Sequence, residues 1–430
     1  MILALREFVW VCATIIGMTP QAFYYTIFGM SSPWDIRDVS LDAENKTVHV
    51  YVDHDPSQGR LRCSVCGAEC PRYDTLAERT WRHLDTCDYK TYLVCSVPRV
   101  ECPTDGIRVA RTGWAEPNSH FTISFQCHAI LALQATKVQT KAAAFLRISP
   151  DEMNWIMRRA VQRGMARRSK DLHIEKIGLD EKSIGCGHRY MTVLSDTSRG
   201  TVIDLAQDRT TEATVSLLRT SLSPEQRKNI ICVTMDMWKA FATAVRKVLR
   251  RADIAHDRFH ITGYLNEAVD DTRRAEHAAL RKEGNSLLTK SKYLWLKNPE
   301  NLTDKQNALF LAIIKNDLVT PKVWQMKDTF RDFFKCTTIN QAQAFFDNWF
   351  ESAIKISNQY LTKVAIMLKK HLPGLLAAIK HRATNAMAEA INSKIQALKT
   401  SARGFRNFAT YRNAILFFYG GLQLYPQRIP

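Results

Sequence analysis

The sequence predicts an α/β domain that is interrupted by a long helical block and preceded by a small β-rich module and a helical hairpin. Residues 173–262 alternate short apolar runs with helical segments in the order βββ-α-β-α-β, which is typical of a mixed sheet flanked by helices. Residues 263–380 carry charged and apolar residues at helical spacing throughout. Six of the eleven cysteines fall between Cys63 and Cys102, in a segment punctuated by Gly and Pro.

The first segment, residues 1–35, is expected to form a buried helix. Residues 8–30 carry no formal charge, but Pro20 and Gln21 interrupt them. They therefore make a poor membrane anchor, which needs about 20 predominantly apolar residues. No Lys/Arg-rich region or clear cleavage site indicates a secretory signal. We favour the buried helix and expect no membrane partner and a cytoplasmic, nucleoid-associated location.

Residues 36–115 are predicted to form the β-rich module. Residues 47–52 and 90–95 alternate apolar and polar side chains as strands do. The odd cysteine total and the basic surroundings favour metal binding in a reducing compartment over a disulfide scaffold.

The cysteine spacing in this module indicates a zinc site. Cys63 and Cys66 form a CxxC half-site, and Cys102 with Asp105 offers the second pair. Asp is a less common structural zinc ligand than Cys or His, so the fourth position stays open. The other candidates for it are Cys70, His83, Cys87 and Cys95.

Residues 121–170 are predicted to form a helix-turn-helix that contacts DNA. One Ala-rich helix covers residues 129–145, and a second begins after Ser149, where Ser149 and Glu152 form a capping box. The stretch contains nine basic residues and two acids, and an ordinary helical hairpin lacks that imbalance. Arg158, Arg159 and Arg163 are the expected DNA contacts.

The overall charge also indicates a polyanionic partner. The chain has 60 Lys and Arg against 42 Asp and Glu, a formal net charge of +18. Cations that neutralise phosphates release counterions, so nucleic acid is favoured over a merely solvated basic surface.

Two aspartates follow predicted strands of the α/β region. Asp180 is placed at the end of the first strand and Asp236 at the end of the fourth. Ligands bind at the carboxyl ends of strands in open α/β sheets, and oxygen ligands suit Mg²⁺ or Mn²⁺. Each aspartate taken alone is more often a helix cap or turn residue.

A third acid, Glu389, stands out because it is the only acid among residues 369–412, which contain nine Lys or Arg. Asn385, Glu389 and Asn392 share one helix face, so a metal ion is a reasonable partner for this carboxylate. The alternative is a surface ion pair with Lys394 or Arg382. Lys394, Arg403 and Arg406 are expected to hold DNA near the site.

If the three acids converge, two metal ions about 4 Å apart can drive an in-line displacement at phosphorus. One ion activates a water or a 3′-hydroxyl, and the other stabilises the leaving oxygen. No protein nucleophile is then required.

At these residues the chain resembles the ISL-three family of insertion-sequence transposases. The resembling blocks, which run in order through most of the chain, are residues 62–67, 80–85, 97–103, 178–183, 234–238, 257–260, 385–395 and 404–407. The resemblance implies an RNase H-like DDE domain in which Asp180, Asp236 and Glu389 form the catalytic triad. It also implies a DNA transposase that recognises double-stranded element ends and target DNA, usually as a homo-oligomer.

The resemblance gives the other segments roles as well. The interval of 153 positions from Asp236 to Glu389 implies that 263–380 is an inserted helical domain between the core parts 173–262 and 381–430. Asp105 stands where the family usually carries Cys or His. Asp257 and His260 match a family motif, and we favour a structural role for His260 at a helix start.

Two rival functions remain. A related DNA nuclease or integrase differs from a transposase in strand transfer. A transposase-derived regulator binds DNA without metal-dependent cleavage, and the three intact acids argue against it.

Overall fold

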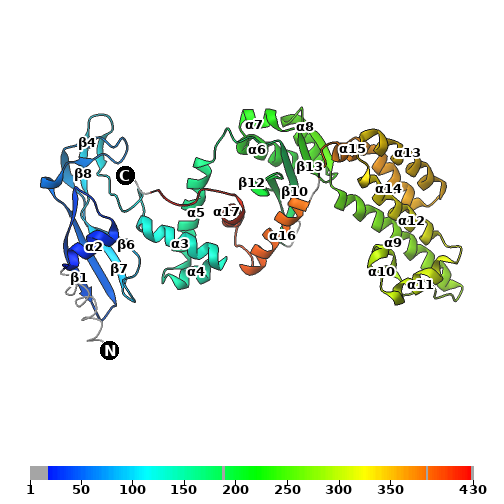
Figure 1. Cartoon of the computed structure of the whole chain (residues 1–430), viewed down its shortest axis with the longest axis horizontal. Coiled ribbons are helices and arrows are strands. Elements are labelled where there is room, and N and C mark those ends of the chain that lie inside the picture. The colour runs from blue at the N-terminus through cyan, green and yellow to red at the C-terminus, as the bar shows by residue number, and fades with distance from the viewer. Residues whose placement is uncertain (1–17, 186–188, 384–385, 428–430) are drawn as a thin grey trace. The chain divides into compact units, whose positions relative to one another are not determined.

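The computed structural model describes residues 18–185, 189–383 and 386–427. The chain divides into two compact units, Met1–Arg168 with Leu422–Pro430 and Ser169–Gly421. Figure 1 labels their elements. Within the described residues, no helix combines the length and apolar character that a membrane crossing requires.

The β-rich module of the first unit contains two larger sheets and a short two-stranded one. Its first sheet has the order β1-β2-β7-β6 and its second the order β5-β8-β9, while β3 pairs with β4. The elements are α2 (Pro20–Phe28), β1 (Trp34–Asp42), β2 (Thr47–His54), η1 (Pro56–Gln58), β3 (Leu61–Arg62), β4 (Glu69–Cys70), β5 (Arg72–Thr75), β6 (Arg79–Arg82), β7 (Lys90–Cys95), β8 (Pro98–Cys102) and β9 (Gly106–Val109).

Aromatic side chains hold this module together. Trp114 makes edge-to-face contacts with Trp34 and Trp81, at ring-centroid distances of 5.0 and 5.8 Å. Tyr24 and Phe28 of α2 are buried in the same core. Of the predicted buried N-terminal helix, the structure describes only α2, which buries these two residues, and residues 1–17 lie outside the described residues.

Three helices follow: α3 (Ile123–Thr136), α4 (Gln139–Phe145) and α5 (Pro150–Arg167). The prediction of one helix over residues 129–145 was wrong, because Lys137 adopts a left-handed φ of 54° and ends α3 there. The capping box at Ser149 and Glu152 is confirmed at the start of α5.

The C-terminal tail packs on these helices, although the sequence placed it with the catalytic region. Arg167 donates to the Tyr425 carbonyl at 2.7 Å, and the Tyr425 hydroxyl hydrogen-bonds Gln134 at 2.7 Å. Gly164 permits the approach, since a Cβ there would lie 2.6 Å from Leu422 Cβ.

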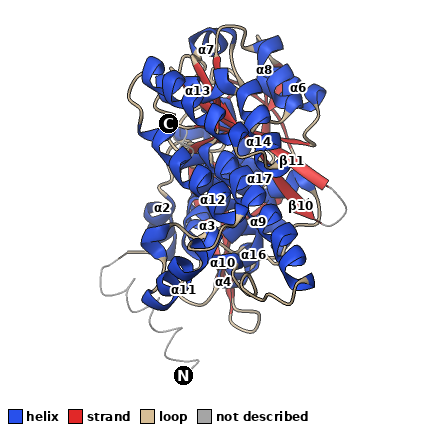
Figure 2. Ribbon diagram, turned by 90° about the vertical axis from the view of Figure 1, so that its right-hand side faces the viewer, coloured by secondary structure: helices blue, strands red, loops and turns tan. Residues whose placement is uncertain are grey.

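The second unit contains the predicted mixed sheet, with the strand order β12-β11-β10-β13-β14. β10 pairs antiparallel with β11 and parallel with β13, and Figure 2 shows the β10–β11 hairpin. The elements are β10 (Lys176–Gly185), β11 (Arg189–Asp196), β12 (Thr201–Gln207), α6 (Thr211–Ser221), α7 (Pro224–Asn229), β13 (Cys232–Met235), α8 (Lys239–Val248) and β14 (Asp253–His256). The predicted order is confirmed, with α7 as an addition.

The two faces of β10 contact different helices. Ile177 and Leu179 enter a core with residues of α6 and α8. Gly178 faces α16 (Ala386–Ser401), and a Cβ there would lie 3.9 Å from Ala388 Cβ and 2.8 Å from Ser195 Oγ. Because side chains alternate along a strand, Asp180 points to the α16 side as well.

The helical block between β14 and α16 has a separate apolar core. Its elements are α9 (Arg258–Lys282), α10 (Lys292–Leu296), η2 (Pro299–Asn301), α11 (Asp304–Ile314), α12 (Val319–Phe330), η3 (Arg331–Lys335), α13 (Ile339–Lys355), α14 (Gln359–Lys370) and α15 (Leu372–Lys380). α15 returns to the sheet beside β14, where Gly374 lies against the His256 ring. α17 (Phe408–Tyr419) then packs on β12.

Candidate functional site

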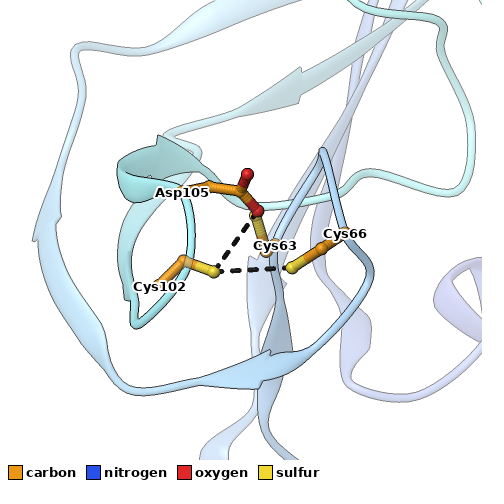
Figure 3. Close-up of side chains that lie close together, drawn as sticks. All are labelled: Cys63, Cys66, Cys102 and Asp105. Atoms are coloured by element: carbon orange, nitrogen blue, oxygen red, sulfur yellow. Dashed lines mark hydrogen bonds between the residues drawn. The ribbon is translucent and has the colours of Figure 1, made fainter.

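Four side chains of the β-rich module form a compact cluster. The ligand atoms of Cys63, Cys66, Cys102 and Asp105 all lie within 4.8 Å of one another. Figure 3 shows the four side chains pointing toward one centre. The Sγ atoms of Cys66 and Cys102 are 3.4 Å apart, and Asp105 Oδ2 lies 3.5 Å from Cys63 Sγ.

The electrostatics of this cluster suit a metal-binding thiolate. The Thr104 hydroxyl and two backbone amides lower the pKa of Cys102 to about 7. The neighbouring Asp105 carboxylate raises the pKa of Cys66 to about 11. Zinc binds the deprotonated thiol, so a thiolate at Cys102 favours its binding.

The other candidates for the fourth ligand lie outside this cluster. Cys70 and Cys95 are buried in the module core, and Cys87 is exposed. His83 Nδ1 is 2.9 Å from Thr122 Oγ1, and burial lowers the pKa of its ring to about 4. Asp105 is therefore the fourth member of the group.

In the second unit, Asp180 lies within β10 rather than at its end. The predicted strand end was wrong, because β10 continues its pairing with β11 from Asp180 opposite Val193 to Gly185 opposite Arg189. The side chain is half-buried and accepts a hydrogen bond from the Asn392 amide of α16. Burial raises the pKa of the Asp180 carboxyl, and the Asn392 hydrogen bond opposes that rise.

Asp236 follows the last residue of β13, as predicted. Its Oδ1 accepts from the Trp238 amide at 2.9 Å, which holds the loop before α8. Burial raises the pKa of the half-buried Asp236 carboxyl, and the negative charges of Glu181 and Asp180 raise it further. Asp180 within β10 and Asp236 directly after the neighbouring strand β13 thus interact electrostatically.

His260 completes this edge of the sheet from the first turn of α9. Asp257, the N-cap of that helix, accepts from the Phe259 amide at 2.9 Å, and its Oδ2 is 3.7 Å from His260 Nε2. The positive form of His260 lowers the pKa values of both Asp180 and Asp236.

A stacked arginine, which sequence reasoning missed, links the two aspartate-bearing segments. The Arg209 guanidinium lies 4.0 Å from the Tyr190 ring centroid and 4.4 Å from that of Trp238. It also pairs with Glu181 at 2.7 Å, and Trp238 Nε1 donates to the Arg209 carbonyl at 3.3 Å. Arg209 follows β12 in a loop and carries no sequence motif, so only the fold identifies it.

Glu389 lies on α16, the helix that contacts β10. It is exposed on the first turn of α16 and lines a cavity with residues of α9 and α15. Asn392, three residues later on α16, bonds Asp180. Asn385, the third member of the predicted face, lies outside the described residues. In the described chain, the three acids do not gather within 4.8 Å of one another as the cysteine cluster does.

The predicted DNA-contact residues differ in exposure. Arg158, Lys394, Arg403 and Arg406 are exposed, and Arg159 is half-buried over the Trp155 ring. The side chain of Arg163 is 9% exposed. It bonds Glu116 at 2.9 Å, Gln126 at 3.1 Å and the Leu424 carbonyl. Because these bonds occupy its guanidinium, we assign Arg163 to packing of the C-terminal tail and not to DNA.

Comparisons with known proteins match both units. A DDE family model of the ISL3 type, described as a transposase, matches residues 177–415, and one described as a zinc-finger of transposase IS204/IS1001/IS1096/IS1165 matches residues 60–105. The chain is 29% identical to the transposase for insertion sequence element IS1557 of Mycobacterium tuberculosis, over 80% of this chain and 83% of that protein. It is 26% identical to the transposase for insertion sequence element IS1001 of Bordetella parapertussis, over 84% and 89%.

Proposed function

The chain belongs to the ISL3-type family of DDE insertion-sequence transposases, and on this premise we propose that it cuts and joins DNA with divalent metal ions held by Asp180, Asp236 and Glu389. The observation that carries the proposal is the pair of half-buried aspartates at neighbouring strands, Asp180 within β10 and Asp236 directly after β13. The family resemblance assigns both aspartates to the catalytic triad, and their neighbouring positions in the sheet support the same site.

The donor set fits Mg²⁺ or Mn²⁺. Carboxylate oxygens are hard ligands, which these ions prefer over nitrogen and sulfur. Burial raises the pKa values of both aspartates, because each charge is removed from water without full compensation. A divalent cation supplies that compensation. When bound, it polarises the phosphoryl group and stabilises charge on the attacking and leaving oxygens.

Helix α16 carries Glu389, the third acid of the proposed site. The Asn392 amide ties α16 to Asp180, and Glu389 lies one turn away on the same helix. We propose that Glu389 moves toward the aspartates when metal binds, since attraction to the cation replaces repulsion between carboxylates.

Arg209 is proposed as a positioning residue. Its ion pair with Glu181 holds the strand that carries Asp180, and its stacking on Trp238 holds the loop that follows Asp236. It also neutralises Glu181, a fourth acid whose charge raises the pKa values of both aspartates. His260 is proposed to orient the same edge through Asp257.

DNA contacts are proposed on both units. α4 and α5 support a helix-turn-helix in which Arg158 and Arg159 face DNA. In the second unit, Lys394, Arg403 and Arg406 are exposed cations on and just after α16. Phosphate contacts of this kind position DNA without reading its sequence.

The cysteine cluster is proposed to bind zinc through Cys63, Cys66, Cys102 and Asp105. Three thiols and one carboxylate make four ligands, the number that a closed structural zinc site requires. By its family resemblance, we propose that the module helps to recognise the element ends.

The test is cleavage and strand transfer of DNA bearing the ends of the element, with Mg²⁺, by the full chain. We expect Asp180→Ala, Asp236→Ala and Glu389→Ala each to keep DNA binding and to lose cutting by about a thousandfold or more, since metal catalysis contributes several kcal/mol. Glu351→Ala is the matched control, an exposed acid in the helical block.

Cutting that survives in one of the three variants removes that residue from the site. If the wild-type protein cuts DNA without strand transfer, a related DNA nuclease is favoured over a transposase. If it binds DNA without cutting it, a transposase-derived regulator is favoured.

A further inference from the structure

A cavity of about 560 Å³ lies at the two junctions between the helical block and the sheet region, at the start of α9 and the end of α15. It is lined by Arg258 and Phe259 at the start of α9, by Phe334 of η3, by Ile379 and Arg382 at the end of α15, and by Glu389. Its volume falls within the range of about 300–1,000 Å³ that small-molecule sites occupy. Its position beside Glu389 connects it with the proposed catalytic edge.

Two arginines give the cavity a positive rim. Arg258 and Arg382 are exposed, and neither has a carboxylate within ion-pair distance among the described residues. The Arg258 guanidinium lies 5.0 Å from the Phe334 ring centroid, so stacking holds it at the cavity wall. Guanidinium groups at such a rim suit phosphate oxygens.

An aromatic ring is presented beside these cations. The Phe259 side chain is 64% exposed, although burial of a phenyl ring is normally favourable. Its backbone is held, because its amide donates to the Asp257 side chain at 2.9 Å, and its ring packs edge-to-face on His260 at 5.8 Å. An exposed ring on a fixed backbone is a suitable stacking platform for a base.

We propose that this cavity binds one unpaired nucleotide of the DNA substrate, with its base on Phe259 and its flanking phosphates at Arg258 and Arg382. Apolar walls from Phe334 and Ile379 suit a base, and the rim charges suit the backbone. A paired base inside a duplex does not expose its face, so the site selects a single-stranded or unpaired position. The assignment to the substrate strand rests on the proposed function, whereas the binding itself does not.

The test measures binding of a fluorescein-labelled ten-nucleotide oligothymidine by the full chain, with chelator present, by anisotropy. We expect Phe259→Ala to weaken binding about 5- to 100-fold, the effect of losing one stacked base, and Phe259→Tyr to retain it. Arg258→Gln and Arg382→Gln should each reduce the slope of log affinity against log salt by about 0.7.

Matched controls are Tyr293→Ala, an exposed aromatic residue in α10, and Arg281→Gln, an exposed cation at the far end of α9. Unchanged oligothymidine affinity in Phe259→Ala, or an unchanged salt slope in both Arg258→Gln and Arg382→Gln, would overturn the proposal. Because binding is measured without metal, this outcome is independent of cutting. If the wild-type protein cuts DNA and Phe259→Ala binds oligothymidine normally, only the nucleotide site is rejected. If Phe259→Ala binds weakly and the wild-type protein does not cut DNA, only the proposed catalysis is rejected.

Discussion

The two candidate metal sites of this chain differ in how completely the protein assembles them. In the β-rich module, the ligand atoms of Cys63, Cys66, Cys102 and Asp105 gather within 4.8 Å. At the sheet, Asp180 and Asp236 interact electrostatically and Glu389 lines a cavity with residues of α9 and α15, and among the described residues these three acids do not gather within 4.8 Å.

The chemistry of the ligands explains this difference. Hydrogen bonds link the Cys63 and Cys102 thiols to Asp105 and join Cys66 to Cys102, so the members of the cluster attract one another. Carboxylates repel, and two such charges 4 Å apart interact by roughly 4 kcal/mol at an effective dielectric constant of 20. We infer that the protein preforms the first site, whereas a metal ion completes the second.

The largest expected effect concerns the preformed cluster. Cys63→Ser, or removal of zinc by a chelator, should cost more than about 4 kcal/mol of module stability, because a structural metal contributes directly to folding. Metal content by atomic emission and thermal unfolding measure it. Cys87→Ser, which changes an exposed thiol outside the cluster, should leave both unchanged. A Cys63→Ser protein with full zinc content and normal stability would contradict the cluster assignment.

The next effect concerns completion of the carboxylate site. Mn²⁺ at a hundred times its dissociation constant should stabilise the wild-type second unit by about 2.7 kcal/mol, since it binds only the folded state. Glu389→Gln should lose most of this gain, as one of three ligands is missing. Thermal unfolding across a Mn²⁺ titration measures it, with Glu351→Gln as the control. Equal stabilisation of Glu389→Gln and wild type would show that Glu389 is not a ligand.

Arg209 provides a smaller test of the same edge. Arg209→Gln should slow cutting about tenfold while DNA affinity is unchanged, because stacking and a half-buried ion pair each contribute about 1 kcal/mol. Arg209→Lys retains the charge near Glu181 but lacks the flat stacking surface, so it should be intermediate. Single-turnover cleavage measures both rates, and Arg219→Gln, an exposed residue of α6, is the control. Normal rates for Arg209→Gln would remove it from the site.

The smallest effect is a pH dependence of the metal-free protein. The Asp180 pKa is raised in the folded state, so this group's contribution to stability is fully present below the ordinary Asp pKa and is lost as pH rises through the raised value. Asp180→Asn keeps an acceptor for Asn392 and removes the charge. It should therefore stabilise the metal-free protein at pH 7, with the gain vanishing near the ordinary Asp pKa of about 4. Thermal unfolding in chelator at both pH values measures it, and a gain independent of pH would exclude the charge as its cause.

Local features of the fold could be predicted because they depend on neighbouring residues. The capping box at Ser149, the strand over residues 90–95 and the position of Asp236 after β13 follow from spacing and periodicity within a few residues. The CxxC pair at Cys63 and Cys66 belongs to the same class, and it lies in the cluster as expected.

Contacts and strand pairings between segments that are distant in the sequence could not be predicted in this way. Periodicity did not reveal that β10 continues past Asp180, because only pairing with β11 extends it. The Arg163 side chain looked like a DNA contact, and its bonds to Glu116 and Leu424 appear only when the tail packs on α5.

The sequence by itself indicated most of the element types, the family, and the acids and thiols that we propose carry the chemistry. Tertiary structure alone decided that Asp105 is the fourth member of the cysteine cluster, that Asn392 bonds Asp180, and that Arg209 stacks between Tyr190 and Trp238. Hydrogen bonds, stacking and Coulomb interactions act over a few ångströms in space. Residues separated by tens or hundreds of positions meet at that range only after the chain has folded.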